Sequence, residues 1–197
     1  MPLNPEATFD SLFIASRLQR ETDTLTAPEI HLFGYLACLI WLYRRRAVSD
    51  WGYSFVGTEL GAPFSLDIDY TVKVLIERGY FIRIQERIRL SELADQRLRD
   101  LEGLVLNQER AECLRAACAS IAAFSAGMVG SALAQEPDLR RSRSMPTSRP
   151  LLEDSVRSQL YGQFETLRAS LLHAGDDLRL PAVVWLTALY RTSELTP

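Results

Sequence analysis

Two hydrophobic patterns divide the first quarter of the chain. Apolar residues recur every three or four positions over residues 5–18, and residues 28–46 are almost continuously apolar until three arginines close the segment. The first pattern predicts an amphipathic helix and the second a buried helix. Two helix starts support this interpretation. Asn4 stands directly before a proline, and Thr26 stands three residues before Glu29, which is the spacing of a capping box.

A third helix and a pair of strands are predicted next. Residues 66–79 have helical spacing and end at Gly79, a residue suited to a helix C-terminus. Two short runs follow, at 80–84 and 87–90, in which apolar and polar residues alternate, so they predict a β-hairpin. The residues expected to face inward are Ile82, Ile84, Ile88 and Leu90. Those expected to face outward are Arg83, Arg87 and Arg89.

The order of these elements predicts the fold. Helix, short helix, helix, hairpin and a further capped helix at 92–101 follow one another, which is the order of a winged-helix domain. We expect a mainly α protein in which residues 1–103 form a winged-helix domain with an N-terminal helix and a small β-hairpin wing. A long helix and C-terminal helices would follow this domain.

Alanine and glycine dominate the segment after the hairpin. Residues 116–134 carry no charge, and residues 104–136 predict one long alanine-rich helix. Small residues recur in it at helical spacing, which would let a partner helix approach closely. The candidate contact positions are Ala119, Ala123, Gly127 and Gly130. On this interpretation Ala123→Leu overpacks the contact and disrupts folding or assembly.

Residues 137–150 are rich in proline, serine and arginine, and this composition predicts a flexible linker. Its arginines Arg140, Arg141 and Arg143 are candidate contacts for nucleic acid, and a merely solvated linker is the alternative. Helical spacing returns after residue 151, so residues 151–197 are expected to form C-terminal helices that pack on the body.

Composition narrows the class of protein. The chain has 197 residues, of which 47 % are hydrophobic and 24 % charged, so it can bury a core and is neither wholly disordered nor collagen-like. Its net charge of -3 disfavours a strongly basic nucleic-acid binder. Three cysteines are too few for a disulfide framework, and the first residues lack a secretory signal, so we expect a cytoplasmic location. We expect no membrane span, because alanine, serine and glycine drive insertion poorly.

Candidate catalytic and metal-ligating residues are few. The sequence contains neither a phosphate-binding glycine loop nor a nucleophile elbow. His31 and His173 fall in separate predicted helices, and His31 is expected to be a cap-region or core histidine. Cys113 and Cys118 are five residues apart, which is the wrong spacing for the usual zinc pairs.

Two acidic pairs complete the search for catalytic or metal sites. Asp67 with Asp69 and Asp176 with Asp177 are close in sequence, yet no third ligand is spaced beside either pair. We therefore expect a protein that is not an enzyme, that uses no cofactor or metal, and that has no small-molecule substrate.

The charges of the predicted domain bear on DNA binding. A recognition helix presents its first turn to base edges beside phosphates. Here that helix would be 66–79, and its first turn carries Asp67 and Asp69, which phosphates repel. The wing arginines Arg83, Arg87 and Arg89 remain candidate DNA contacts, with a solvated face as the alternative.

Three stretches of the sequence resemble a known family. They are the opening PLNPEATFDSLFIASRL, then LTAPEIHLFGYLACLIWLYRRR, then the wing with the alanine-rich helix after it. Together they are similar to the middle component of the ABC three-component bacterial defence systems, whose counterpart in Lamassu systems is the small LmuC subunit. The likeness covers residues 3–135 and consists of a hydrophobic pattern, a Leu-Thr-x-x-Glu helix start and an ERGY-like entry to the wing.

This resemblance implies a non-catalytic adaptor or regulatory subunit of an anti-phage or anti-plasmid complex. Such a subunit links an SMC- or Rad50-like ATPase to an effector, often a nuclease, and restrains the effector until foreign DNA is sensed. DNA is then contacted indirectly or weakly, through the wing. The residues alone leave two alternatives open, namely a winged-helix DNA-binding transcription regulator and an enzyme or other unclassified module.

Overall fold

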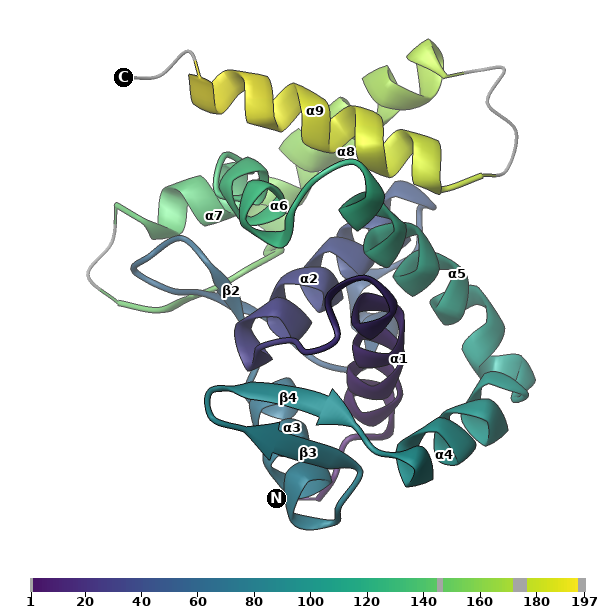
Figure 1. Ribbon diagram of the computed structural model, residues 1–197. Helices are drawn as coiled ribbons and strands as arrows, with labels where there is room; N and C mark the ends of the chain where they lie inside the picture. The colour runs from purple at the N-terminus through teal and green to yellow at the C-terminus, as the bar shows by residue number, and fades with distance from the viewer. Residues whose placement is uncertain (1, 145–146, 172–176, 195–197) are drawn as a thin grey trace.

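The computed structural model describes residues 2–144, 147–171 and 177–194, which are mainly helical with small antiparallel sheets (Figure 1). The α-helices are α1 (Pro5–Thr22), α2 (Ala27–Tyr43), α3 (Leu66–Glu77), α4 (Glu92–Glu102), α5 (Val105–Ala119), α6 (Ala126–Leu133), α7 (Pro137–Ser142), α8 (Asp154–Ser170) and α9 (Arg179–Glu194). The 3-10 helices are η1 (Val48–Trp51) and η2 (Ser120–Ala122). The strands are β1 (Val56–Gly57), β2 (Pro63–Phe64), β3 (Phe81–Ile84), β4 (Arg87–Leu90) and β5 (Arg149–Pro150). They pair in the orders β2-β1-β5 and β3-β4.

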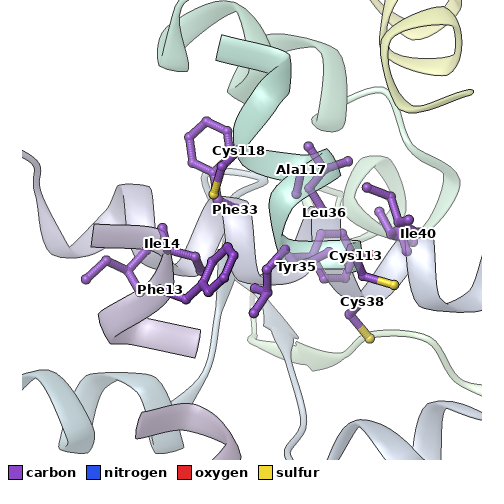
Figure 2. Close-up of a cluster of buried hydrophobic side chains, with 14 of the residues drawn as sticks. Phe13, Ile14, Phe33, Tyr35, Leu36, Cys38, Ile40, Cys113, Ala117 and Cys118 are labelled. Atoms are coloured by element: carbon purple, nitrogen blue, oxygen red, sulfur yellow. The ribbon is translucent and has the colours of Figure 1, made fainter. Parts of the chain in front are cut away.

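Helix α2 lies at the centre of the molecule. It contacts α1, α3, α5, α6 and α8, and most of its side chains are buried, as its continuous apolar run predicted. Figure 2 shows Phe33, Tyr35 and Leu36 of α2 between Phe13 of α1 and Ala117 of α5. Because α2 is apolar on every side, neighbouring helices have to surround it, and this requirement sets the arrangement of the rest of the chain.

The predicted helix ends are confirmed where a local cap forms them. The side chain of Asn4 accepts a hydrogen bond from the backbone N–H of Ala7 at 2.9 Å, which begins α1. The backbone N–H of Thr26 donates to Oε2 of Glu29 at 2.5 Å, as a capping box requires. After α3, Gly79 has a φ of +74°, a left-handed conformation that glycine adopts without strain.

The predicted long helix over residues 104–136 is instead broken. Helix α5 ends at Ala119, the short η2 follows, and α6 begins at Ala126 at an angle of 113° to the preceding segment. The side chain of Ser125 caps α6 by accepting from the N–H of Met128 at 3.3 Å. Alanine and glycine bury little apolar surface, so the stretch carries no continuous face that would hold one straight helix, and a serine cap starts a new one.

The predicted flexible linker at residues 137–150 contains ordered structure in its described part. Helix α7 occupies Pro137–Ser142, with Leu139 and Ser142 buried, and strand β5 pairs with β1 through the partners Val56–Pro150 and Gly57–Arg149. The composition alone suggested disorder, but a buried glutamate cap and a strand partner far away in sequence fix this segment. Residues 145 and 146 of the predicted linker lie outside the described residues.

The β3–β4 hairpin forms where it was predicted, but its inward face is partly different. The partners are Phe81–Leu90, Ile82–Arg89, Arg83–Ile88 and Ile84–Arg87. Phe81, Ile88 and Leu90 are buried, whereas Ile82 and Ile84 are 41 % and 42 % exposed, so the prediction that these two face inward was wrong. The cause is Phe81, which takes the core position and sends the next residue to the opposite face.

No single helix of the described chain is long and apolar enough to cross a membrane. The segments Val105–Ala122 and Ala126–Leu133 pass such a test only as a pair, with the bend between them.

Candidate interaction surfaces

Helix α3 presents an acidic and apolar first turn to solvent. Leu66 is 69 % exposed, Asp67 and Asp69 are half-buried, and Nζ of Lys73 donates to Oδ2 of Asp69 at 2.7 Å. Lys73, the only lysine of the chain, is therefore occupied within the helix. The sequence prediction of an acidic leading turn thus corresponds to an accessible acidic surface.

His31 fixes the start of α3 from within the core. Its Nδ1 accepts the backbone N–H of Ser65, the N-cap residue of α3, at 3.1 Å, and its ring stacks on Phe64 at 4.8 Å between centroids. Burial lowers the pKa of His31 from its usual 6.5 to about 4, and Asp69 opposes that change. The interpretation of His31 as a cap-region or core histidine is confirmed, since the neutral ring acts as a hydrogen-bond acceptor.

The three predicted hairpin arginines do not share one face. The register places Arg87 and Arg89 on the same face as Ile82, while Arg83 lies on the opposite face near the turn. Arg87 is also engaged, because its Nε donates to Oγ1 of Thr24 and its Nη2 to the carbonyl of Thr24, both at 2.6 Å. Arg83 and Arg89 remain the more available cations of this hairpin.

The α7 arginines belong to a different part of the surface. Arg140, Arg141 and Arg143 are exposed, and Figure 1 shows α7 well away from the β3–β4 hairpin. Arg143 lies against the β1–β2 turn, since a Cβ at Gly61 would meet its Cγ and Cδ at 2.4 Å. The two predicted sets of basic residues therefore do not merge into one basic surface.

The predicted small-residue contact positions are also separated. Ala119 ends α5, Ala123 lies between η2 and α6, and Gly127 and Gly130 lie in α6. Ala123 and Gly127 are exposed, whereas a Cβ at Gly130 would lie 3.9 Å from Cδ2 of Leu32 in α2. The bend after α5 is the reason that these residues do not form one stripe for a partner helix.

A buried ion pair that the sequence did not predict joins α1 to α5. The Nε and Nη2 of Arg110 donate to the two oxygens of Asp10 at 2.5 and 2.7 Å, and its Nη1 donates to the carbonyl of Trp51 at 2.8 Å. The hydroxyl of Tyr53 donates to Oδ2 of Asp10 at 2.6 Å, and the guanidinium stacks 3.8 Å from the Trp51 ring centroid. The polar side-chain atoms of Asp10, Arg110 and Tyr53 are all hydrogen-bonded within the protein, so these three side chains hold α1, α5 and the segment after α2 together.

A second buried carboxylate anchors the segment that composition had assigned to a linker. Glu136 caps α7 by accepting the N–H groups of Asp138 and Leu139, at 3.1 and 2.9 Å, and the hydroxyl of Tyr35 donates to it at 3.1 Å. Burial raises the pKa of Glu136 to about 7. Asp138 accepts the N–H of Leu152 at 2.5 Å, which fixes the chain before α8.

The cysteines Cys38, Cys113 and Cys118 are buried and free. Burial raises the pKa of the Cys113 thiol to about 12 and also raises the pKa of the thiols of Cys38 and Cys118. Among the described residues, no three His, Cys, Asp or Glu side chains are grouped as a metal site needs. His173 and Asp176 lie outside the described residues.

Comparison with known proteins gives no relative. No family model, curated protein or solved structure matches the chain.

Proposed function

We propose that this chain is a non-catalytic adaptor or regulatory subunit of a bacterial anti-phage or anti-plasmid defence complex. It links an SMC- or Rad50-like ATPase to an effector, a nuclease in this proposal, and restrains the effector until foreign DNA is sensed. The sequence resemblance supplies the identity of these partners. The surface of α3 supports binding of protein rather than DNA by the chain.

The proposal includes a winged-helix arrangement of the N-terminal half. Its support is the element order α1, α2, α3, β3, β4, together with an antiparallel bridge between Leu25 and Ile88. A residue between the first two helices thus pairs with the second strand of the hairpin, as the first strand of a winged-helix sheet does. Residues 44–65, which include η1, β1 and β2, would then be an insertion between the second and third helices.

The observation that carries the proposal is the leading turn of α3. In a DNA-binding winged helix this turn lies beside phosphates, where Asp67 and Asp69 would be repelled and Lys73 is already paired with Asp69. Leu66, in contrast, is 69 % exposed at this turn. An exposed leucine flanked by carboxylates suits an apolar, basic protein surface better than a duplex.

The alternative is a DNA-binding transcription regulator, and the hairpin favours it. Arg83 is exposed and Arg89 half-buried on this hairpin, and their charges are of the sign that phosphates attract. Such a protein would bind duplex DNA with a steep dependence on salt.

Two measurements on one set of variants test the proposal. The tagged chain is co-expressed with its genomic neighbours and purified mildly, and stoichiometric partners are identified by mass spectrometry. We expect a large coiled-coil ATPase to co-purify with the wild-type chain and with Leu93→Arg. We expect it to be lost with Leu66→Arg. Leu93 is the matched control because it is a 56 % exposed leucine on α4, away from the α3 turn.

DNA binding by the same purified chain distinguishes the alternative. We expect weak duplex binding that Arg83→Glu with Arg89→Glu reduces further, without loss of the ATPase. A homodimer that retains only DNA, with tight binding that those two substitutions abolish, would contradict the adaptor proposal and favour the regulator.

A further inference from the structure

A cleft of about 710 Å³ opens where the ends of three helices meet α5. Its lining comes from the end of α2, the second half of α5, the end of α8 and the start of α9. Among the described residues, two carboxylates and five arginines line it, namely Glu112 and Asp177 with Arg44, Arg45, Arg115, Arg168 and Arg179. A cleft lined mainly by charges of one sign attracts ligands of the opposite sign, so this one is suited to an anion.

Two of these arginines hold the helices around the cleft together. Nε of Arg168 in α8 donates to the carbonyl of Tyr43, the last residue of α2, at 3.1 Å. Nη1 of Arg44 donates to Oε2 of Glu112 in α5 at 2.6 Å. Arg168 and Arg44 therefore join α8 to α2 and α2 to α5, and they fix the shape of the cleft.

The other three arginines reach the cleft from three different elements and remain accessible. Arg115 of α5 is exposed and makes no hydrogen bond or ion pair within the described part of the chain. The side chain of Arg45 is 68 % exposed and donates through Nη2 to Glu165, and that of Arg179 is 65 % exposed and donates through Nε and Nη2 to Asp177. Since a guanidinium has five N–H donors, all three arginines retain donors for a ligand.

Two carboxylates hold positions that a bound anion would take. Oδ1 of Asp177 accepts the backbone N–H and the Nε of Arg179, at 3.0 and 2.9 Å, and these hydrogen bonds lower the pKa of Asp177. Glu165 lies 3.1 Å from Nη2 of Arg45. A phosphate carries more charge and more acceptor oxygens than a carboxylate, so it competes for these arginines better than a second carboxylate would. The cleft therefore favours a phosphorylated ligand over an acidic peptide.

Part of the cleft is apolar. Tyr43, Leu171, Leu178 and Pro181 line it together with the arginines. A cleft of this volume that combines apolar side chains with a few charged groups is typical of a small-molecule site. Aromatic and aliphatic side chains also pack well against the flat face of a nucleobase.

We propose that this cleft binds a nucleotide that carries more than one phosphate. Arg45, Arg115 and Arg179 hold the phosphates, and the base lies against the apolar residues around Tyr43. The chain lacks a phosphate-binding glycine loop, and arginine forks take its place here. The proposal concerns binding alone, includes no chemical step and does not depend on the adaptor function.

The charges outside the cleft favour a free nucleotide over a nucleic-acid strand. Glu109 and Glu112 of α5 and Glu165 of α8 lie beside the arginines, and each pairs with at least one of them. A strand that continues beyond the cleft would bring further phosphates near these carboxylates, which repel them. A free nucleotide ends within the cleft and avoids this repulsion.

The direct test is calorimetric titration of the purified full chain with ATP at low ionic strength, where charges are least screened. We expect saturable binding of one ATP per chain. Adenosine and tripolyphosphate each supply one half of the ligand, so each should bind at least about tenfold more weakly than ATP. A single-stranded thymidine oligonucleotide and a hexaglutamate peptide represent the two disfavoured anions, and both should bind more weakly than ATP.

Three variants locate the binding and give effects of opposite sign. Arg115→Ala removes the arginine that has no internal partner and should weaken ATP binding about tenfold. Arg97→Ala is the matched control, because Arg97 is an exposed arginine of α4, which Figure 1 shows well away from α9, and it should have no effect. Asp177→Asn removes a competing charge and should strengthen binding about threefold. Such a gain cannot arise from misfolding.

Several results would overturn the inference. They are no saturable binding of ATP, equal weakening by Arg97→Ala and Arg115→Ala, and weaker binding after Asp177→Asn. Tripolyphosphate that binds as tightly as ATP would remove the nucleoside from the proposal. Tighter binding of the oligonucleotide or of hexaglutamate would instead identify a nucleic-acid strand or an acidic protein segment as the occupant. None of these results bears on the adaptor function, which co-purification tests separately.

Discussion

The guanidinium of Arg110 and the carboxylate of Asp10 form a two-point ion pair inside the core, although the residues are 100 positions apart in sequence. Arg110 also donates to the carbonyl of Trp51, so one side chain connects α5, α1 and the segment after α2. The pair lies beneath the 44–65 segment and positions it against the helices. Without this connection, the chain between α2 and α3 would lose one of its buried polar anchors.

Asp10→Ala should be strongly destabilising. It leaves a buried guanidinium without its counter-ion, and breaking a buried pair from one side costs about 3–5 kcal/mol of unfolding free energy. Glu102→Ala is the control, because Glu102 pairs with Arg17 at 3.0 Å near the surface, where such a pair contributes about 0–1 kcal/mol. Urea denaturation of both variants at pH 7 measures the difference. Equal effects would show that the buried pair is not the stronger anchor.

Glu136 should make the chain less stable as the pH rises. Its pKa is about 7 in the folded protein against the usual 4.5, so folding favours the protonated form. The stability gained from this group is complete below pH 4.5 and is lost as the pH rises from 4.5 through about 7. At about 1.4 kcal/mol per pKa unit, the loss of unfolding free energy reaches roughly 3 kcal/mol. Glu136→Gln should gain stability relative to wild type over that range. A constant difference from pH 4.5 to 8 would contradict the buried, protonated carboxyl.

His31 should make the chain less stable as the pH falls. Its pKa of about 4 lies below its usual 6.5, so folding favours the neutral ring, and stability is lost as the pH falls from 6.5 toward 4. The loss reaches roughly 3 kcal/mol at 1.4 kcal/mol per pKa unit. His31→Asn keeps an acceptor for Ser65 and cannot be protonated, so it should remove this acid sensitivity. Thermal melts of the wild type and the variant at pH 7 and pH 4.5 measure this acid sensitivity. Equal sensitivity in the two proteins would show that His31 is not the group responsible.

The features that sequence could predict are those with local causes. Asn4 and Thr26 mark helix starts because each makes a capping hydrogen bond with a residue three positions away, and Gly79 marks a helix end by its own conformation. The mainly helical class follows from such signals. The Asp10–Arg110 pair and the hydrogen bond from Tyr35 to Glu136 join residues about 100 positions apart, and no spacing in the sequence predicts them.

The candidate surfaces were predictable only in part. The acidic first turn of α3 could be predicted because its residues are close together in the sequence. The structure adds that Lys73 is paired with Asp69 there. The exposure of Ile82 and Ile84 could not be predicted, because the burial of Phe81 rather than Ile82 depends on how the hairpin packs on the core. A one-residue difference in strand phase reverses every side chain, so that surface required the structure.

Two glycines should respond in opposite ways to alanine. A Cβ at Gly57 of β1 would lie 2.5 Å from Cβ and Oγ of Ser142, so Gly57→Ala forces α7 away from the β1–β5 pairing and should cost about 1–3 kcal/mol. A Cβ at Gly162 of α8 meets nothing within 4 Å, so Gly162→Ala should stabilise the helix by about 0.5–1 kcal/mol. Urea denaturation compares them. Destabilisation by Gly162→Ala would show that α8 packs more tightly than the structure indicates.

The break after α5 reverses the expectation for Ala123→Leu. On one continuous helix this change would overpack a close contact, but Ala123 is exposed between η2 and α6. The unfolding free energy of the Ala123→Leu variant should therefore differ from that of the wild type by no more than about 0.5 kcal/mol. Ala117→Leu is the matched control, because Ala117 is fully buried in α5 and added volume there should cost about 1–3 kcal/mol. Denaturation midpoints of the two variants test the bend directly, since a straight helix that packs through Ala123 would make Ala123→Leu the more damaging change.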